Sequence, residues 1–311
     1  MTTRDHATAA DTAAPERLMH VNGVDLCVQT FGDPAAPPVL LVNNSLLGWP
    51  AEFCARLAAG PRFVMRYDLR DTGRSTATDP DAPPYVLRDL VADAAGLIGA
   101  LGLRRAHVAG FGVGGWIGQL LALDHPERVA SLALLCTRPT APGPSDPDLP
   151  EHSPEIMEFF MTEPEPDWSD RAAVLAYQAA ARRRLAGSHP FDEAAAREDA
   201  GRIYDRTVAA APPGAVPRKI HPANQIASTF AALDSGDRWR ERLGELTVPT
   251  LVVHGEEDPF FPLGNGEALA REIPGAQLLV LPRTGHELPR PVWDTVVPAL
   301  LRHTEVAAAE D

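Results

Sequence analysis

Two side chains near the end of the sequence could act together as an acid–base pair. Asp258 lies in HGEEDPFFP and His286 lies in RTGHELP, and each follows a short apolar run typical of a buried strand. A carboxylate that hydrogen-bonds one ring nitrogen of a histidine makes the other nitrogen an effective general base. Each residue alone is a weak signal, because most histidines are surface or structural residues. Together, and in this order, they indicate proton-transfer chemistry.

A glycine-rich turn, GFGVGG at residues 110–115, stands between a strand-like run and a helical pattern. A nucleophile elbow has the form G-x-S-x-G at such a junction, and its central residue projects over a sheet. Gly110 and Gly114 are in register with the two outer glycines, and Gly112 stands where the serine would be. A phosphate-binding loop is the competing interpretation, but the turn lacks the lysine of a Walker loop. The turn, Asp258 and His286 reproduce the chain order of nucleophile, acid and histidine.

Gly112 has no side-chain atom that can attack a carbonyl. Loss of the serine from a Ser–His–Asp triad costs on the order of a million-fold in turnover, so an ordinary serine esterase mechanism is excluded. Glycine does suit the strained backbone of an elbow, and we expect the turn to fold. Ser45, in a loop predicted to face the elbow, is the one hydroxyl considered as a replacement nucleophile. A turn or cap serine is the simpler interpretation of Ser45.

Other reactive side chains are interpreted as structural. Cys54 falls in the helical pattern PAEFCARLA, and we expect it to be packed in the core. Asp68 and Asp71 are expected to pair with loop groups near Arg70 or Arg74. The sequence contains no cluster of His, Cys, Asp or Glu with metal-ligand spacing. We therefore expect neither a metal nor a cofactor.

The elements that must position these residues alternate between short strand-like runs and helical patterns, which predicts a doubly wound, mostly parallel sheet. Asn22-Gly23 between the first two runs is a strong hairpin signal. Ligands of such sheets bind beyond the carboxyl ends of the strands, where the turn, Asp258 and His286 all stand. The predicted strands lie at Leu18–Val21, Val24–Phe31, Val39–Val42, Arg62–Asp68, Ala106–Gly110, Ser131–Cys136, Pro249–Asp258 and Ala276–His286.

The composition of the sequence changes in residues 138–246, where proline-rich stretches flank Ala/Arg/Glu-rich helical segments. We interpret this part as a helical cap inserted between the sixth and seventh strands of an eight-stranded sheet. Residues 18–137 and 247–304 form the predicted α/β core. Residues 1–17 are predicted to be a disordered lead-in, and residues 305–311 a flexible tail.

Composition limits the partners. The net charge of −14 argues against nucleic acid and anionic membranes. Three widely spaced cysteines indicate reduced thiols, and neither a signal peptide nor a transmembrane run is evident, so we expect a cytoplasmic protein. Of the 28 basic residues only Lys219 is a lysine, a usage associated with GC-rich genomes such as those of actinomycetes.

The motifs FGDP, LGWPAEF, RYDLRDTGRS, ALDHPERV, LAGSHPFD, VPTL and GHELP give the chain a family resemblance. From Leu18 to His303 it resembles the α/β-hydrolase superfamily, and within it the aclacinomycin methylesterase group of polyketide-tailoring enzymes. The resemblance implies an eight-stranded α/β-hydrolase fold with a helical cap. RYDLRDTGRS is the most telling motif, since Asp71 stands where many relatives carry glycine.

The resemblance also implies roles for individual residues. Asp258 becomes the triad acid and His286 the triad base. The oxyanion donors become the backbone N–H of Val113 and one from the loop after Val42, at Asn44, with Asn43 and Ser45 beside it as polar groups. This loop lacks the glycine-rich start of the family and is shorter.

Three hypotheses about function remain open. The first is a natural enzyme that uses the Asp258–His286 dyad as general base for cyclisation, elimination, isomerisation, rearrangement or water-mediated hydrolysis of a polyketide. The second is a serine hydrolase whose elbow serine has been replaced by Gly112, and the third is a non-catalytic binding protein. Several aromatic residues are candidates to line a pocket for a bulky apolar or aromatic small molecule, and a homodimer is left open. These pocket candidates are Phe111, Trp116, Phe159 and Phe160.

Overall fold

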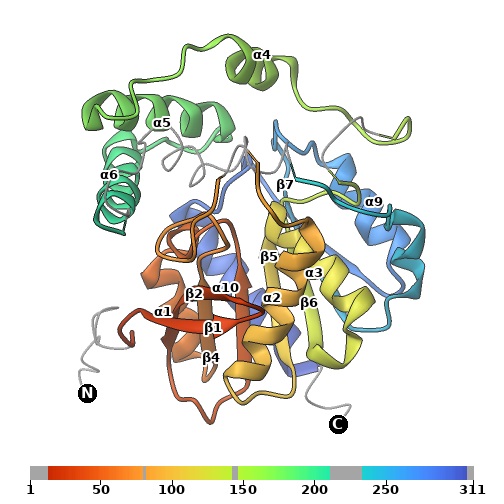
Figure 1. Ribbon diagram of the computed structural model, residues 1–311. Coiled ribbons are helices and arrows are strands. Elements are labelled where there is room, and N and C mark those ends of the chain that lie inside the picture. The colour runs from red at the N-terminus through yellow and green to blue at the C-terminus, as the bar shows by residue number, and fades with distance from the viewer. Residues whose placement is uncertain (1–12, 80–81, 142–145, 211–232, 307–311) are drawn as a thin grey trace, which may run out of the picture.

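The computed structural model describes residues 13–79, 82–141, 146–210 and 233–306 and contains an eight-stranded sheet (Figure 1). Its strand order is β1-β2-β4-β3-β5-β6-β7-β8, with β1–β2 and β2–β4 antiparallel and the other pairs parallel. The predicted mostly parallel, eight-stranded architecture is confirmed. The strands are β1 (Arg17–Val21), β2 (Val24–Phe31), β3 (Pro38–Val42), β4 (Phe63–Tyr67), β5 (Ala106–Phe111), β6 (Val129–Leu135), β7 (Thr250–Gly255) and β8 (Gln277–Leu281).

The first hairpin forms where the sequence predicts it. Val21 pairs with Val24, so Asn22 and Gly23 are its two turn residues. Both have positive φ, 49° and 80°, as a type I′ turn requires.

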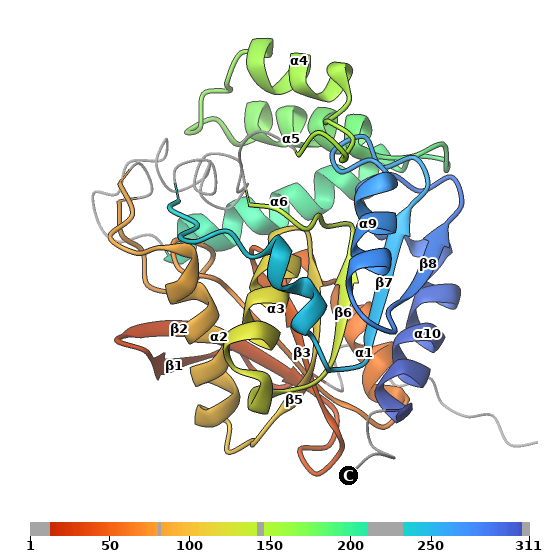
Figure 2. The same ribbon diagram turned by 90° about the vertical axis from the view of Figure 1, so that its right-hand side faces the viewer.

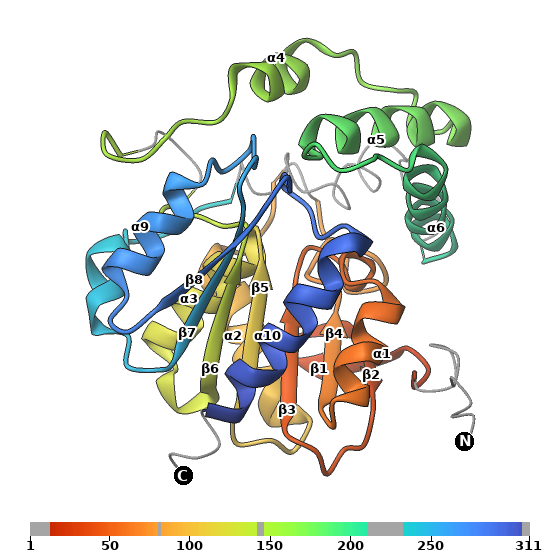
Figure 3. The same ribbon diagram turned by 180° about the vertical axis from the view of Figure 1, so that it is seen from behind.

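Helices cover both faces of the sheet, as Figures 2 and 3 show from two further sides. On one face, α2 (Leu87–Ala100), α3 (Val113–Asp124) and α9 (Gly264–Glu272) bury their apolar sides in the larger core cluster. On the other face, α1 (Ala51–Ala59) and α10 (Trp293–Val306) pack in a second cluster. The central strands are therefore buried on both sides, which explains their continuous apolar runs.

In the described part of the chain, three helices form a cap over the carboxyl ends of the parallel strands (Figure 1): α4 (Pro154–Thr162), α5 (Arg171–Leu185) and α6 (Glu193–Ala210). The cap is smaller than predicted. Residues 233–246, including the 3₁₀ helix η3 (Arg240–Glu245), belong to the core, because Trp239 and Leu243 are buried in the larger cluster. The Trp239 indole N–H also donates to Gln119 Oε1 on α3 at 2.9 Å. Residues 211–232 of the predicted cap lie outside the described residues.

The predicted outer boundaries of the core also differ from those in the structure. Ala13 forms a β-bridge with Phe31, and Glu16 forms ion pairs with Arg74 and Arg206, so residues 13–17 are ordered. The lead-in predicted for residues 1–17 is therefore too long, because Glu16 has partners distant in sequence. Helix α10 continues to Val306, beyond the boundary predicted at 304. In the described ranges, no helix combines the length and apolar character needed to cross a membrane.

Candidate active site

The turn between β5 and α3 has the geometry of an elbow. Gly112 caps α3 with φ 55° and ψ −114°, a conformation that side-chain-bearing residues rarely adopt. A Cβ on Gly110 would lie 2.0 Å from the Gly114 carbonyl oxygen, and one on Gly114 would lie 2.1 Å from the Val42 oxygen. The outer glycines are therefore required by close backbone packing.

Space does not impose glycine at the centre of the elbow. A Cβ built on Gly112 would meet one neighbour within 4 Å, His286 Nε2, at an ordinary contact distance of 3.6 Å. The backbone of Gly112 is held by a hydrogen bond from its N–H to Leu135 O at 3.0 Å and by one from Thr137 Oγ1 to its carbonyl at 2.7 Å. The elbow thus keeps its shape and aims the vacated position at the histidine.

Asp258 and His286 lie together, on the loops that follow β7 and β8. His286 Nδ1 is 2.9 Å from Asp258 Oδ2, and the carboxylate is buried. The other carboxylate oxygen, Oδ1, accepts the backbone N–H groups of Phe260 at 2.9 Å and Phe261 at 2.8 Å. An ionised Asp258 held in this way accepts the Nδ1 proton of His286 and leaves Nε2 as the basic nitrogen. That nitrogen faces Gly112.

A second histidine stands beside the same carboxylate. His254, at the end of β7, is fully buried with Nε2 3.7 Å from Asp258 Oδ2 and 2.7 Å from the Phe261 carbonyl oxygen. Burial lowers the pKa of His254, so the ring is neutral near pH 7 and donates to Phe261. The sequence analysis missed this neighbour. The spacing His254-x-x-x-Asp258 across a strand end is the signal that could have found it.

Aromatic rings surround His286. The ring centroids of Phe111, Phe260 and Phe261 lie 5.0, 5.1 and 5.4 Å from that of the imidazole. Phe260 was not singled out from the sequence, although it is two residues after Asp258. The His286 side chain is 12% exposed, so these rings shield most of it from solvent and present apolar surfaces beside it.

The remaining aromatic candidates lie further out. Phe160 of α4 is 6.2 Å from Phe260, so it reaches this shell from the cap, and Phe159 lies behind it at 5.5 Å. Trp116 packs 6.0 Å from Phe261, and its buried indole N–H has no hydrogen-bond partner among the described residues. These candidates therefore contact the rings around His286, or one another, and not the imidazole itself.

The oxyanion side is less open than the resemblance implied. Val113 holds the first helical position of α3, where a backbone N–H has no acceptor within the helix. The Asn44 N–H, however, donates to Asn43 Oδ1 at 2.8 Å. Ser45 is buried and precedes the short 3₁₀ helix η1 (Leu46–Gly48), and among the described residues no hydrogen bond joins it to His286. Asn43 thus occupies one of the two expected donors.

Neither a thiol nor a metal cluster supplies another reactive centre in the described parts of the chain. Cys54 is buried, and burial raises the pKa of its thiol to about 12, far from the thiolate form. Within the described ranges, no group of three or more His, Cys, Asp or Glu side chains could hold a metal ion. The titratable side chain that faces the vacated elbow position is His286.

Comparisons with known proteins agree with the observed fold. The α/β hydrolase fold family matches residues 38–289. Rhodomycin D methylesterase DauP of Streptomyces sp. (strain C5) is 33% identical and covers 94% of this chain and 99% of its own. A putative carbamate hydrolase, RutD of Variovorax paradoxus (strain S110), is 31% identical over 81% of this chain and 86% of its own. The meta-cleavage product hydrolase CumD of Pseudomonas fluorescens IP01 has a similar fold, with a TM-score of 0.69 at 20% identity over 94% of this chain and 98% of its own.

Proposed function

Because the chain belongs to the α/β-hydrolase fold family, we propose that it is a natural-product tailoring enzyme that uses His286 as a general base and forms no acyl-enzyme. The observation that carries this proposal is the 2.9 Å contact between His286 Nδ1 and Asp258 Oδ2, with Nε2 aimed at a residue that has no side chain. The dyad can take a proton from a carbon acid, a hydroxyl or a water molecule placed beside Gly112.

The surroundings favour a bulky aromatic substrate, a polyketide in the first instance. Phe111, Phe260 and Phe261 offer ring faces and edges next to the base. The 33% identity to rhodomycin D methylesterases over almost the whole chain supports the same class of substrate. Cyclisation, elimination, isomerisation and rearrangement can each proceed by base-assisted proton transfer without an acyl-enzyme.

A serine hydrolase that has lost its serine is the second candidate, and one observation favours it. The Cβ position on Gly112 is open and 3.6 Å from His286 Nε2, so a serine there could reach the histidine. The occupied Asn44 N–H weighs against this candidate, because tetrahedral intermediates need oxyanion donors.

The base can be tested without knowing the natural substrate. Nitrobenzisoxazole is a flat aromatic probe that opens when a base removes its ring proton, and the product absorbs visible light. We expect the protein to catalyse this opening and His286→Ala to reduce the rate by about 10²-fold. His125→Ala, at the surface end of α3, is the matched control and should keep the full rate. Equal rates for the two variants would overturn the proposal.

A further inference from the structure

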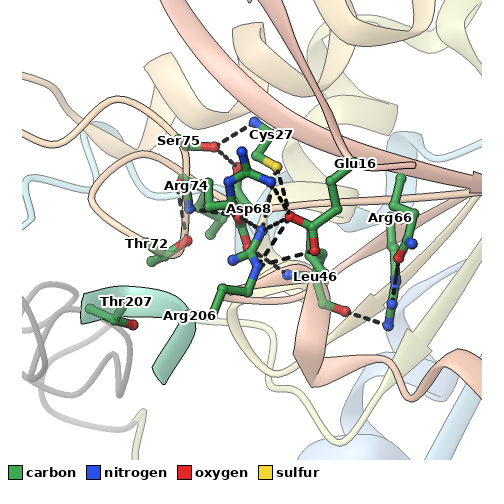
Figure 4. Close-up of polar contacts among 12 residues, drawn as sticks. Glu16, Cys27, Leu46, Arg66, Asp68, Thr72, Arg74, Ser75, Arg206 and Thr207 are labelled. Atoms are coloured by element: carbon green, nitrogen blue, oxygen red, sulfur yellow. Dashed lines mark hydrogen bonds and ion pairs between the residues drawn. The ribbon is translucent and has the colours of Figure 1, made fainter. Parts of the chain in front are cut away.

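Helix α6 of the cap sends one arginine into the core. Arg206 Nη2 lies 2.7 Å from Asp68 Oδ2 and 2.9 Å from Glu16 Oε2, and it also contacts Cys27 Sγ at 3.4 Å (Figure 4). Asp68 is fully buried at the end of β4, and the Arg206 side chain is 13% exposed. The guanidinium of this cap residue, Arg206, is therefore buried in the core next to two carboxylates.

The core is shaped to receive this guanidinium. A Cβ on Gly73, in the loop after β4, would lie 2.1 Å from Arg206 Nη1 and 2.3 Å from Asp68 Oδ2. Glycine at this position thus leaves the room that the arginine fills. Burial raises the pKa of Asp68, and the charge of Arg206 opposes that rise. Arg206 is the ion-pair partner of this carboxylate, which also accepts the Arg74 backbone N–H at 2.9 Å.

The other oxygen of Asp68 leads to the loop beside the elbow. Asp68 Oδ1 accepts the backbone N–H of Leu46 at 2.9 Å. The same loop is held at Asn44, whose carbonyl accepts Leu69 N–H at 3.1 Å and Thr72 Oγ1 at 2.7 Å. This loop follows β3, and Val42 at its start packs against Gly114 of the elbow. One carboxylate therefore joins the cap to the oxyanion side of the candidate site.

The cap is attached on the opposite side by a different set of bonds. Leu185 O, in the last residue of α5, accepts the His286 N–H at 2.8 Å, and in the segment that follows Gly187 N–H donates to Glu287 Oε1 at 3.2 Å. Ser188 N–H and Oγ both donate to Glu257. These bonds hold the acid–base loops and do not involve Arg206.

We propose that Arg206 is a positioning residue that couples the seating of helix α6 to the conformation of the Asn43–Leu46 loop through Asp68. The inference rests on the proposed function only in that it assigns this loop to the reaction site. A cap that lifts at α6 withdraws the counter-charge, and Asp68 then releases Leu46. A ligand that seats the cap orders the loop in return, because such coupling is reciprocal.

Amide hydrogen exchange followed residue by residue tests this coupling without any turnover. We expect Arg206→Gln to raise the exchange rate of Leu46 by about tenfold and to leave Gly187 within about twofold of the wild-type rate. Arg206→Lys retains a cation, and we expect it to restore Leu46 protection. Arg202→Gln is the matched control, because Arg202 lies one turn earlier on α6 and pairs with exposed Glu198 and half-buried Asp199.

Several outcomes contradict the coupling. Unchanged Leu46 exchange in Arg206→Gln would do so, as would an Arg206→Lys variant that behaves like Arg206→Gln. A parallel rise at Leu46 and Gly187 would indicate general loosening of the cap. Should Arg206→Gln fail to fold, Glu16→Gln provides a milder variant that leaves the Arg206–Asp68 pair intact. Leu46 should stay protected in this variant, and faster exchange at Leu46 would contradict the route through Asp68.

Discussion

The two halves of the candidate site differ in how many of the groups needed for catalysis they provide. On the acid–base side, Asp258 uses both oxygens, and His286 is held at its ring and at its backbone N–H. On the elbow side, the turn keeps its backbone but Gly112 offers no reactive atom, and Asn43 occupies the Asn44 N–H. The groups that proton transfer needs therefore lie on different loops from the groups that covalent catalysis needs. The first depends on side chains at two strand ends, and the second on one side chain and two free N–H groups.

The largest expected effect comes from the acid–base side. In Asp258→Asn, the amide oxygen can still accept the Phe260 and Phe261 N–H groups, so the amide nitrogen faces His286 Nδ1 and imposes the wrong tautomer. We expect the rate of nitrobenzisoxazole opening to fall by about 10³-fold with little change in fold. Glu256→Gln, in the same loop, is the control. Full activity in Asp258→Asn would show that the acid–base side does not depend on the contact between this carboxylate and the histidine.

A smaller effect is expected when the Asn44 N–H is made available as an oxyanion donor. In a Gly112→Ser background, Asn43→Ala removes the acceptor of the Asn44 N–H and makes that donor available. We expect hydrolysis of a nitrophenyl ester to rise by about tenfold. Asn43→Asp keeps an oxygen acceptor and should give no rise. A similar rise in both variants would show that the Asn43–Asn44 bond does not limit this side.

We expect a side chain at the centre of the elbow to lower the stability of the protein, although there is space for a Cβ. Gly112→Ala places a Cβ at φ 55°, and we expect the free energy of unfolding to fall by about 1–3 kcal/mol in denaturant titrations. Gly244→Ala, which has open space and no positive φ, should be close to neutral. A neutral Gly112→Ala would mean that the strained elbow geometry has been lost.

The smallest effect concerns the histidine behind Asp258. Burial lowers the pKa of His254 in the folded protein, whereas the unfolded chain takes up the proton near pH 6.5. Stability is therefore lost as pH falls below that value. His254→Gln keeps a donor for Phe261 and cannot titrate, so it should lose about 1 kcal/mol less than wild type between pH 7.5 and 5.5. Parallel pH curves would place the protonation elsewhere.

Local signals in the sequence predicted a large part of this molecule. Asn22-Gly23 predicted the first hairpin because a two-residue turn with positive φ needs such residues. Strand-like runs predicted the sheet, and the order of Gly112, Asp258 and His286 predicted which strand ends meet.

Contacts between distant segments could not be predicted in the same way. Residues 233–246 looked like cap, because nothing local shows that Trp239 packs on α3. Asp68 was expected to pair near Arg70 or Arg74, and it does accept the Arg74 N–H at 2.9 Å. Its charged partner, Arg206, lies 138 residues away and is one of many helix arginines. The Asn43–Asn44 bond depends on a side-chain rotamer, which no spacing reveals.

Covalent labelling tests the central claim, that a functional general base faces an elbow without a nucleophile. Wild-type protein and Gly112→Ser are each treated with a fluorophosphonate, and the intact mass is measured. We predict no adduct on the wild type and one adduct on Gly112→Ser, lost again when His286→Ala is added, because the vacated position lies 3.6 Å from His286 Nε2. An adduct on the wild type, at Ser45 or elsewhere, would contradict the absence of a nucleophile. An unlabelled Gly112→Ser would contradict the orientation of the base.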